Sequence, residues 1–366
     1  MKHEKISVAM LTNDMNINGI STVVMNYCKY LNKEKFNITI IAGRPINELY
    51  VEECKKYGIT LMEMPERREK PTRFYLRLFK CFIANKYDIV HVHGNSAMIT
   101  PELFLAWTCG IKHRIAHSHN STCDNMKAHR VLLPIFNKLY TDGFACSNLA
   151  GRWLFGTNKF KILNNGFLVE KFKFDNAKRQ SLRKKYGLED SFVIGNVARF
   201  NDQKNHQFLL NVFESVAEQK ANAKLVLIGT GPNLESVKAR IANSKFKDRI
   251  LYLGESDKVN ELYNLMDVFV LPSKHEGLGI VFIEAQINGL PVVTSDQVPR
   301  EVNIGEMTMF LPLKESADKW AGEILKVKYI DRDAFYEEHR SKIDLYNIKN
   351  NAKELENYYE SMMEIR

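Results

Sequence analysis

Short apolar segments alternate with longer amphipathic ones along this sequence, and this alternation is the feature that most limits the possible folds. In the first half, apolar runs predict strands and apolar residues at helical spacing predict helices. We expect strands at residues 6–11, 36–42, 60–64, 89–93, 114–117 and, as the last of this half, 143–147, with helical segments at 20–31, 46–57, 73–83 and 99–109. Short connections between such elements favour a parallel sheet with helices on both faces.

The same alternation restarts in the second half of the chain. Strands are expected at residues 192–197, 224–228, 250–253, 268–271 and 292–294, with helices at 206–219, 259–266 and 280–288. A chain of 366 residues is too long for one typical hydrophobic core. We therefore expect two α/β domains, each with its own parallel sheet.

Polar residues follow several of the predicted strands, where α/β sheets bind their ligands. In the first half, such polar strand ends lie at residues 16–19, 91–94 and 117–120. In the second half Arg199 and Lys204 follow the strand at 192–197. Solvated loops are the commoner place for such cations, so position alone does not make them binding residues.

The stretch Ser273 to Gln286 has the properties of an anion-binding turn. Gly277 and Gly279 lie where a strand passes into a helix. Free backbone N–H groups and the positive end of the helix dipole meet there. Glu276 precedes the helix and Glu284 lies about two turns along it. A nucleotide-sugar would fit, with its diphosphate at the helix start, sugar hydroxyls on Glu276 and ribose hydroxyls on Glu284. Their spacing alone does not distinguish these two glutamates from ordinary solvated residues.

This stretch resembles the E-x7-E signature of the family-four retaining glycosyltransferases. The resemblance implies the GT-B fold, an α/β class in which two Rossmann-like domains with parallel sheets face a central cleft. It implies that Glu276 holds the donor sugar, that Glu284 holds the donor ribose and that the turn formed by Gly277, Leu278, Gly279 and Ile280 contacts the donor. Arg199 and Lys204 match the family's Gly-Arg…Lys-Asn pattern, with Ala198 in place of the glycine, which implies that both clamp the donor diphosphate.

Four histidines, His91, His93, His117 and His119, raise the question of a metal site. We rank metal last, because period-2 spacing puts His91 and His93 on one face of a strand and no carboxylate or cysteine completes a set. Family members often carry a histidine close to the donor sugar and the acceptor at this place, and both His117 and His119 match it. We favour His119 because a short polar residue, Asn120, follows it as in the family.

The resemblance also implies binding residues near the first strand and the domain limits. Gly19 is expected to contact substrate, and Asn18 replaces a family glycine with a residue that tolerates the left-handed conformation. Asn165-Gly166 is a strong turn signal and resembles the opening of the family's interdomain linker. The expected parts are an acceptor-binding domain at 1–165, a nucleotide-sugar-binding domain at 166–345 and a terminal helix at 346–366 that crosses back to the first domain.

Composition limits the cellular setting. Six scattered cysteines without a C-x-x-C pair argue against zinc and against disulfides. The N-terminus runs directly into a strand and no apolar run approaches twenty residues, so we expect a cytoplasmic protein.

Charge is unevenly distributed. Residues 1–165 contain 23 Lys and Arg against 13 Asp and Glu, a net +10, whereas the remainder is close to neutral at −1. The basic segment at 73–83 is either a membrane-binding helix or a core-packed helix with solvated charges. Because no nucleic-acid module is recognisable, an anionic membrane is the favoured partner of this half, with no role for nucleic acid.

Taken together, these features predict a retaining glycosyltransferase that needs no cofactor or metal. It would move a sugar from a nucleotide-sugar donor, expected to be a UDP-sugar, to a lipid-linked or saccharide acceptor in capsule, exopolysaccharide or cell-wall glycan synthesis. It would work as a peripheral protein at the inner face of the plasma membrane. Two alternatives remain: a catalytically silent partner subunit, and an NAD-dependent oxidoreductase, which would need a G-x-G-x-x-G after the first strand.

Overall fold

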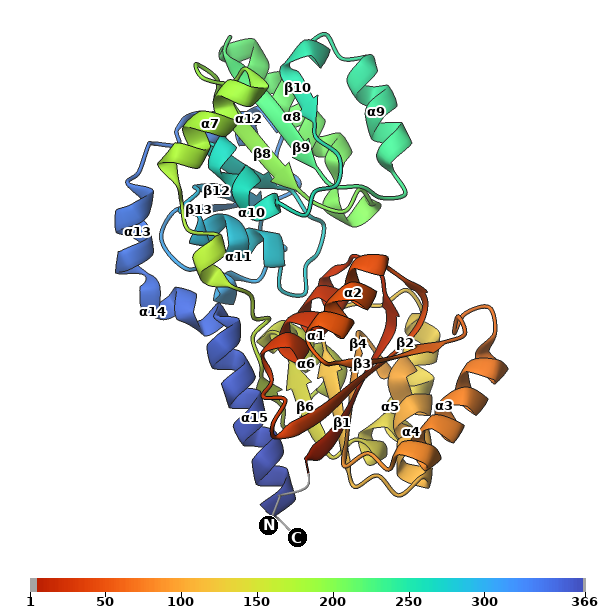
Figure 1. The fold of residues 1–366 in the computed structure, drawn as a ribbon. Helices are drawn as coiled ribbons and strands as arrows, with labels where there is room; N and C mark the ends of the chain where they lie inside the picture. Colours follow the sequence, from red (N-terminus) through yellow and green to blue (C-terminus); the bar gives the residue numbers. More distant parts are fainter. Residues whose placement is uncertain (1–4, 365–366) are drawn as a thin grey trace. The chain divides into compact units, whose positions relative to one another are not determined.

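The computed structural model describes residues 5–364, and contacts divide the chain into two compact units (Figure 1). Unit 1 consists of the chain up to Phe167 together with the chain from Leu345 onward, and unit 2 is Leu168–Asp344. Residues 1–4 and 365–366, which the predicted domains include, lie outside the described residues. No helix within residues 5–364 is long and apolar enough to span a bilayer. All six cysteines lie within the described residues, and none of them forms a disulfide.

Unit 1 contains a seven-stranded parallel sheet among the described residues, in the order β3-β2-β1-β4-β5-β6-β7. Its strands are β1 (Ile6–Met15), β2 (Phe36–Ile46), β3 (Thr60–Met64), β4 (Ile89–Gly94), β5 (His113–Ser118), β6 (Asp142–Ala145) and β7 (Lys161–Ile162). The expectation that the strand near Gly143 is the last of this half was wrong, because β7 extends the sheet by pairing with β6. The short β7 carries too little apolar sequence to be recognised as a strand.

Helices cover both faces of this sheet. They are α1 (Gly19–Tyr30), α2 (Glu48–Lys56), α3 (Pro71–Asn85), α4 (Thr100–Thr108), α5 (Met126–Leu139), α6 (Asn148–Phe155) and α15 (Ile348–Glu364). The strand order reverses after β3, so right-handed crossovers place α1 and α2 on one face and α3, α4 and α5 on the other. The terminal helix α15 packs beside α1 (Figure 1), where Glu356 accepts a hydrogen bond from the Asn32 N–H at 2.6 Å.

Unit 2 contains a six-stranded parallel sheet among the described residues, in the order β10-β9-β8-β11-β12-β13. Its strands are β8 (Phe192–Val197), β9 (Ala223–Ile228), β10 (Ile250–Tyr252), β11 (Val268–Leu271), β12 (Val292–Ser295) and β13 (Thr308–Leu311). Its helices are α7 (Asn176–Tyr186), α8 (His206–Gln219), α9 (Leu234–Ala242), α10 (Val259–Leu262), α11 (Ile280–Ile287), α12 (Ala317–Leu325), α13 (Arg332–Glu338) and α14 (Arg340–Ile343).

The core of unit 2 explains why its strands read as continuous apolar runs. All residues of β11, and all of β9 except Lys224, are buried, because helices cover both faces of the sheet. On one face α8 and α12 pack together, with Phe213 and Trp320 fully buried between helices and sheet. The predicted class, two Rossmann-like α/β domains with parallel sheets, is confirmed.

Candidate active site

In unit 2, two loops meet at the carboxyl ends of the neighbouring strands β8 and β11. The loop after β8 contains Arg199 and Lys204, and the loop after β11 contains Glu276. Backbone hydrogen bonding joins the loops, since the Lys274 N–H donates to the Gln203 carbonyl at 2.8 Å. The Gln203 side chain donates to the His275 carbonyl, also at 2.8 Å. The two motifs recognised separately in the sequence therefore form one site, and Gln203, which sequence reasoning missed, links them.

Lys204 and Glu276 form an ion pair at this junction. The Lys204 Nζ lies 2.5 Å from the Glu276 Oε1, and the side chains are 14% and 6% exposed. Buried charges require such pairing because each loses most of its hydration. Arg199 follows the same strand, but its side chain is exposed. The site thus offers one cation already bound by a carboxylate and a second that faces solvent.

The glycine turn directly precedes α11. Gly279 has φ +77°, in the left-handed region where glycine avoids the strain that other residues meet. Gly277, Leu278 and Gly279 are buried, and Ile280 opens the helix. The positive end of the α11 dipole therefore lies beside the Lys204–Glu276 pair, which makes this edge suitable for a phosphate group.

Glu284 lies on α11, where the Tyr263 hydroxyl donates to its Oε2 at 2.8 Å. Burial raises the pKa of Glu284 to about 7, and the hydroxyl bond opposes that effect in part. This carboxyl therefore changes charge near neutral pH. Tyr263 was not identified from the sequence, because nothing in its local pattern marks it as more than a core aromatic residue.

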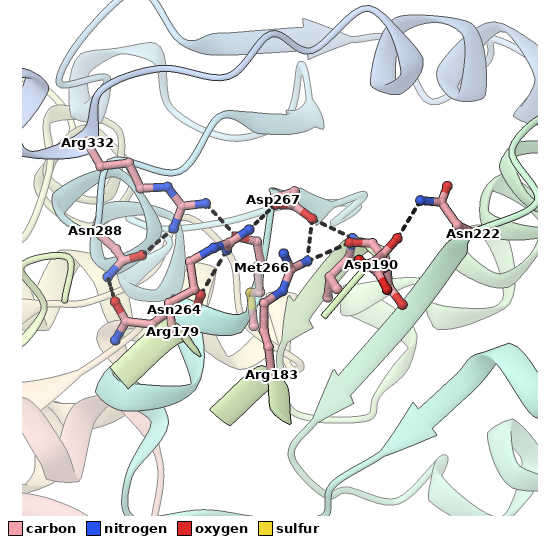
Figure 2. A network of polar contacts seen from close by, with 11 residues as sticks. Arg179, Arg183, Asp190, Asn222, Asn264, Met266, Asp267, Asn288 and Arg332 are labelled. Atoms are coloured by element: carbon pink, nitrogen blue, oxygen red, sulfur yellow. Dashed lines mark hydrogen bonds and ion pairs between the residues drawn. The ribbon is translucent and has the colours of Figure 1, made fainter. Parts of the chain in front are cut away.

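A separate polar network lies at the other end of β11 (Figure 2). Asp267 accepts hydrogen bonds from Arg179, Arg183 and the Val193 N–H, and Arg332 donates to the Asn288 side chain at 3.2 Å. Burial lowers the pKa of Arg332 to about 9, with the Arg179 charge as the second cause. Asp267 directly precedes β11, and the glycine turn lies after the other end of β11. The network therefore fixes the start of the strand that leads to the site.

In unit 1, the four histidines, here called the histidine tetrad, come together on one face of the sheet. His93 pairs in register with His117, and period-2 spacing puts His91 and His119 on the same face. The His91 Nε2 lies 3.2 Å from the His117 Nδ1, and the His93 Nδ1 lies 2.9 Å from the His119 Nε2. All four are buried, with His119 9% exposed and His117 0%.

Burial keeps the tetrad neutral. Desolvation lowers the pKa of His91 and of His119 to about 3, and it lowers the pKa of His93 and His117 well below the usual value. The Tyr359 hydroxyl on α15 lies 2.7 Å from the His91 Nδ1, so the terminal helix completes the cluster. Neutral imidazoles each carry one donor and one acceptor, which suits sugar hydroxyls.

The tetrad has the residue types of a metal site but not its geometry. Nitrogens of His91, His93 and His117 lie within 4.8 Å of one another. However, the His91 and His93 rings are stacked 4.3 Å apart with planes only 12° from parallel. A bound ion lies close to the plane of each imidazole that ligates it, and one ion cannot lie in both planes. The stacked rings therefore fit hydrogen bonding better than metal ligation.

Two further predicted residues lie near the carboxyl ends of β1 and β5. Gly19 is exposed and opens α1, while the Asn18 side chain caps that helix by accepting from the Ser21 N–H at 3.0 Å. Asn18 has φ −153°, so it caps the helix from extended backbone and does not use its tolerance of the left-handed conformation. Asn120 is partly buried directly after His119, and its Oδ1 accepts from the Ser121 N–H at 2.8 Å.

Comparison with known families agrees with this architecture. The family described as "Glycosyltransferase Family 4" matches residues 17–148, and "Glycosyl transferases group 1" matches residues 178–343. Each match therefore lies within one structural unit.

Two relatives cover most of the chain. The putative glycosyltransferase EpsF of Bacillus subtilis (strain 168) is 30% identical over 341 residues, 89% of this chain and 88% of that protein. The UDP-Gal:alpha-D-GlcNAc-diphosphoundecaprenol alpha-1,3-galactosyltransferase of Escherichia coli is 25% identical over 311 residues, 80% of each chain. Both are glycosyltransferases by name.

Among solved structures, that of Anabaena HepE in complex with UDP and glucose has a TM-score of 0.80, with 97% of this chain and 100% of that chain covered. Its sequence identity is 14%, so this likeness shows the fold alone. It confirms the predicted GT-B fold, with two Rossmann-like domains.

Proposed function

This chain belongs to glycosyltransferase family 4, as its sequence motifs predicted, and we propose that it transfers a sugar from a UDP-sugar to a lipid-linked saccharide. That it is a glycosyltransferase of glycan biosynthesis follows from its relatives. The choice of UDP is supported by the E. coli relative, whose name specifies UDP-Gal, and by the UDP bound to HepE. The acceptor class is supported by the diphosphoundecaprenol-linked sugar in the name of the same relative.

The observation that carries this proposal is the Lys204–Glu276 pair beside the start of α11. Transfer breaks the bond between the anomeric carbon and a phosphate oxygen, and UDP leaves with the electron pair. Lys204, Arg199 and the amides at Gly277 to Ile280 would stabilise the charge that develops on the diphosphate, which removes the need for a metal ion or another cofactor. Glu276 would then accept hydrogen bonds from the sugar hydroxyls.

The other half of the donor would bind at Glu284. An ionised carboxylate accepts both ribose hydroxyls, and the Tyr263 hydroxyl holds it in place. In unit 1, His119 is the favoured histidine because it follows the end of β5 and is more exposed than His117. Its Nδ1, like the Nε2 of His93 and of His117, is buried without a protein partner among the described residues, and the Nδ1 is the atom that would pair with a substrate hydroxyl. Gly19, His117 and Asn120 complete the proposed substrate-binding residues of this unit.

Retention of the anomeric configuration is proposed from the family resemblance. The new glycosidic bond would form on the face from which UDP departs, so the acceptor hydroxyl approaches beside the leaving phosphate and its proton passes to a phosphate oxygen of UDP. A lipid-linked acceptor places the reaction at the anionic inner face of the plasma membrane, where the protein would act as a peripheral cytoplasmic enzyme.

Two substitutions test the site. Glu276→Ala and Lys204→Ala should each reduce sugar transfer by roughly 10²–10³-fold, because each removes a preorganised contact to the transition state. The measurement is turnover at saturating UDP-sugar, with circular dichroism to check that the fold is kept.

Lys238→Ala is the matched control in the same unit, since it breaks an exposed ion pair with Glu235 and should leave transfer unchanged. Near-wild-type turnover of Glu276→Ala would show that the donor site is misplaced. A wild-type chain that binds UDP but transfers no sugar to any lipid-linked saccharide would instead be a silent partner subunit.

A further inference from the structure

Large apolar side chains are exposed on three helices of unit 1. They are Leu76 and Ile83 on α3, Phe104 and Trp107 on α4, and Val131 and Ile135 on α5; we call this set the α3–α5 face. Single exposed apolar residues are common on soluble proteins, but a cluster on adjacent helices marks an interaction surface. Exposure is 73% for Val131, 58% for Leu76 and 54% for Trp107, so these residues are far from buried.

The three helices form one layer. They cover the same face of the sheet, and α4 packs between α3 and α5. The core-facing side of α3 is already satisfied, because Phe74, Leu78 and Phe82 are buried beneath it. The outward residues Leu76 and Ile83 are therefore not needed for the core of unit 1.

Charge on the layer is of one sign. Arg73, Arg77 and Lys80 on α3 are exposed, as are Lys127, Arg130 and Lys138 on α5. Within these three helices, which the structure describes completely, the one carboxylate is that of Glu102. It is buried and paired with Arg67 at 2.5 Å, so it contributes no exposed negative charge.

We propose that the α3–α5 face binds an anionic lipid bilayer, with the six apolar side chains entering the interfacial region and the six cations held among lipid headgroups. Basic residues around apolar ones are the pattern of helices that lie in a membrane surface. The aliphatic members, Leu76, Ile83, Val131 and Ile135, favour hydrocarbon over nucleic acid, which binds through stacking aromatics and cations. Trp107 is suited to the membrane interface, where its ring and its N–H are both accommodated.

This inference rests on the proposed function in one respect, the lipid-linked acceptor. In a βαβ unit the helix starts at the carboxyl edge of the sheet, so α3, α4 and α5 begin at the edge that carries the histidine tetrad. The tetrad itself faces α15, on the opposite face of the sheet. A saccharide anchored in a bilayer on the α3–α5 face would therefore reach the tetrad around this shared carboxyl edge. Only α3 was suggested by the sequence; α4 and α5 enter because the fold places them beside it.

The test is sedimentation of the full chain with phosphatidylglycerol-containing vesicles and with phosphatidylcholine vesicles. Wild type should bind the anionic vesicles, bind the neutral ones weakly and be released at high salt, because the Debye length falls from about 10 Å at 0.1 M to about 3 Å at 1 M. The triple variant Arg73→Glu, Arg77→Glu, Lys80→Glu should bind about 100-fold more weakly. The variant Ile83→Ser, Trp107→Ser, Ile135→Ser should bind at least about tenfold more weakly without loss of charge.

The matched control lies on α2, on the other face of the sheet. Leu49→Ser combined with Lys55→Glu and Lys56→Glu changes exposed residues of the same kinds and should bind vesicles like wild type. Equal loss in this control, or wild-type binding by the triple charge variant, would overturn the proposal. Failure of wild type to bind either kind of vesicle would also overturn it. If such a chain self-associates and the serine variant does not, the face is a protein interface. Vesicle binding needs no donor, so it can fail while UDP binding and transfer persist.

Discussion

The two units build their polar sites in different ways. Unit 2 uses opposite charges: Lys204 with Glu276 at the carboxyl end of its sheet, and arginines around Asp267 at the other end (Figure 2). Unit 1 uses the neutral histidine tetrad, whose members contact one another and Tyr359. A site for a charged diphosphate requires fixed cations, whereas a site for uncharged hydroxyls does not. The difference therefore agrees with the proposal that unit 2 binds the donor and unit 1 binds the acceptor.

The comparison predicts that acid affects the units unequally. Tetrad histidines have a lowered pKa in the folded state, so the unfolded chain takes up more protons below pH 6.5 and stability is lost as pH falls. Each tetrad histidine lowers the free energy of unfolding by roughly 1 kcal/mol for each pH unit below 6.5. With four such histidines, the free energy of unfolding of unit 1 should fall by several kcal/mol by pH 5.5. The raised pKa of the Glu102 carboxyl offsets part of this loss.

Unit 2 should respond much less. Burial lowers the pKa of His206 to about 4, which costs stability in acid. Glu284 acts the other way: with a folded pKa of about 7, it is protonated more readily when folded and stabilises unit 2 as pH falls. Urea unfolding at pH 7.5 and 5.5 can separate the units, because Trp107 and Trp153 report on unit 1 and Trp320 on unit 2. Equal shifts for both reporters would contradict the comparison.

The same contrast explains what could be predicted from the sequence. The E-x7-E motif is local, since Glu276, Gly279 and Glu284 lie in one strand–turn–helix segment, so family membership and fold could be inferred and were confirmed. The ring contacts of the tetrad depend on the register of β4 against β5, which pairs His93 with His117 across 24 residues of sequence. That register follows only from the folded sheet. Tyr359 lies still farther away in sequence, on α15, so no local pattern connects it to His91.

The three-arginine network shows a second limit. Asp267 is an ordinary acid before a strand, and Arg332 lies in a polar segment near the end of unit 2. Sequence reasoning assigned neither a role, because arginine and aspartate at such places are normally solvated. The fold instead buries Arg332, and this burial lowers the pKa of its guanidinium to about 9.

A smaller effect is expected from Glu284, and it would sharpen the picture of unit 2. Because its folded pKa is about 7, the carboxylate proposed to accept ribose hydroxyls becomes more populated as pH rises through neutrality. UDP affinity should rise by up to about tenfold between pH 6 and pH 8, following the ionised fraction. Isothermal titration calorimetry at several pH values would measure it.

Glu284→Gln is the control, because the glutamine amide has about the size of the carboxyl group but does not ionise. Its UDP affinity should be weaker than that of wild type at pH 8 and nearly independent of pH. The same pH slope in both proteins would mean that another group, such as the diphosphate itself, sets the dependence and that Glu284 does not hold the ribose.

The smallest expected effect concerns His93, which lies 2.9 Å from His119 and is proposed to orient its ring. His93→Leu removes this hydrogen bond while keeping an apolar side chain in the buried space. A bond worth about 0.5–1.5 kcal/mol corresponds to a loss of roughly 2- to 10-fold in transfer. His93→Gln, which can restore a hydrogen bond to the His119 Nε2, should recover part of it.

His91→Leu is the matched comparison within the tetrad. It breaks the contacts with Tyr359 and His117 but leaves the His93–His119 pair intact, so it should cost stability with little change in transfer. Nitrogen NMR of the His119 ring would separate positioning from packing, since only His93→Leu should change which ring nitrogen carries the proton. UDP affinity should be unchanged in both variants, because the donor contacts proposed for the nucleotide lie in unit 2. If both leucine variants reduced transfer equally and left the His119 tautomer unchanged, the tetrad would serve the core of unit 1 and not the reaction.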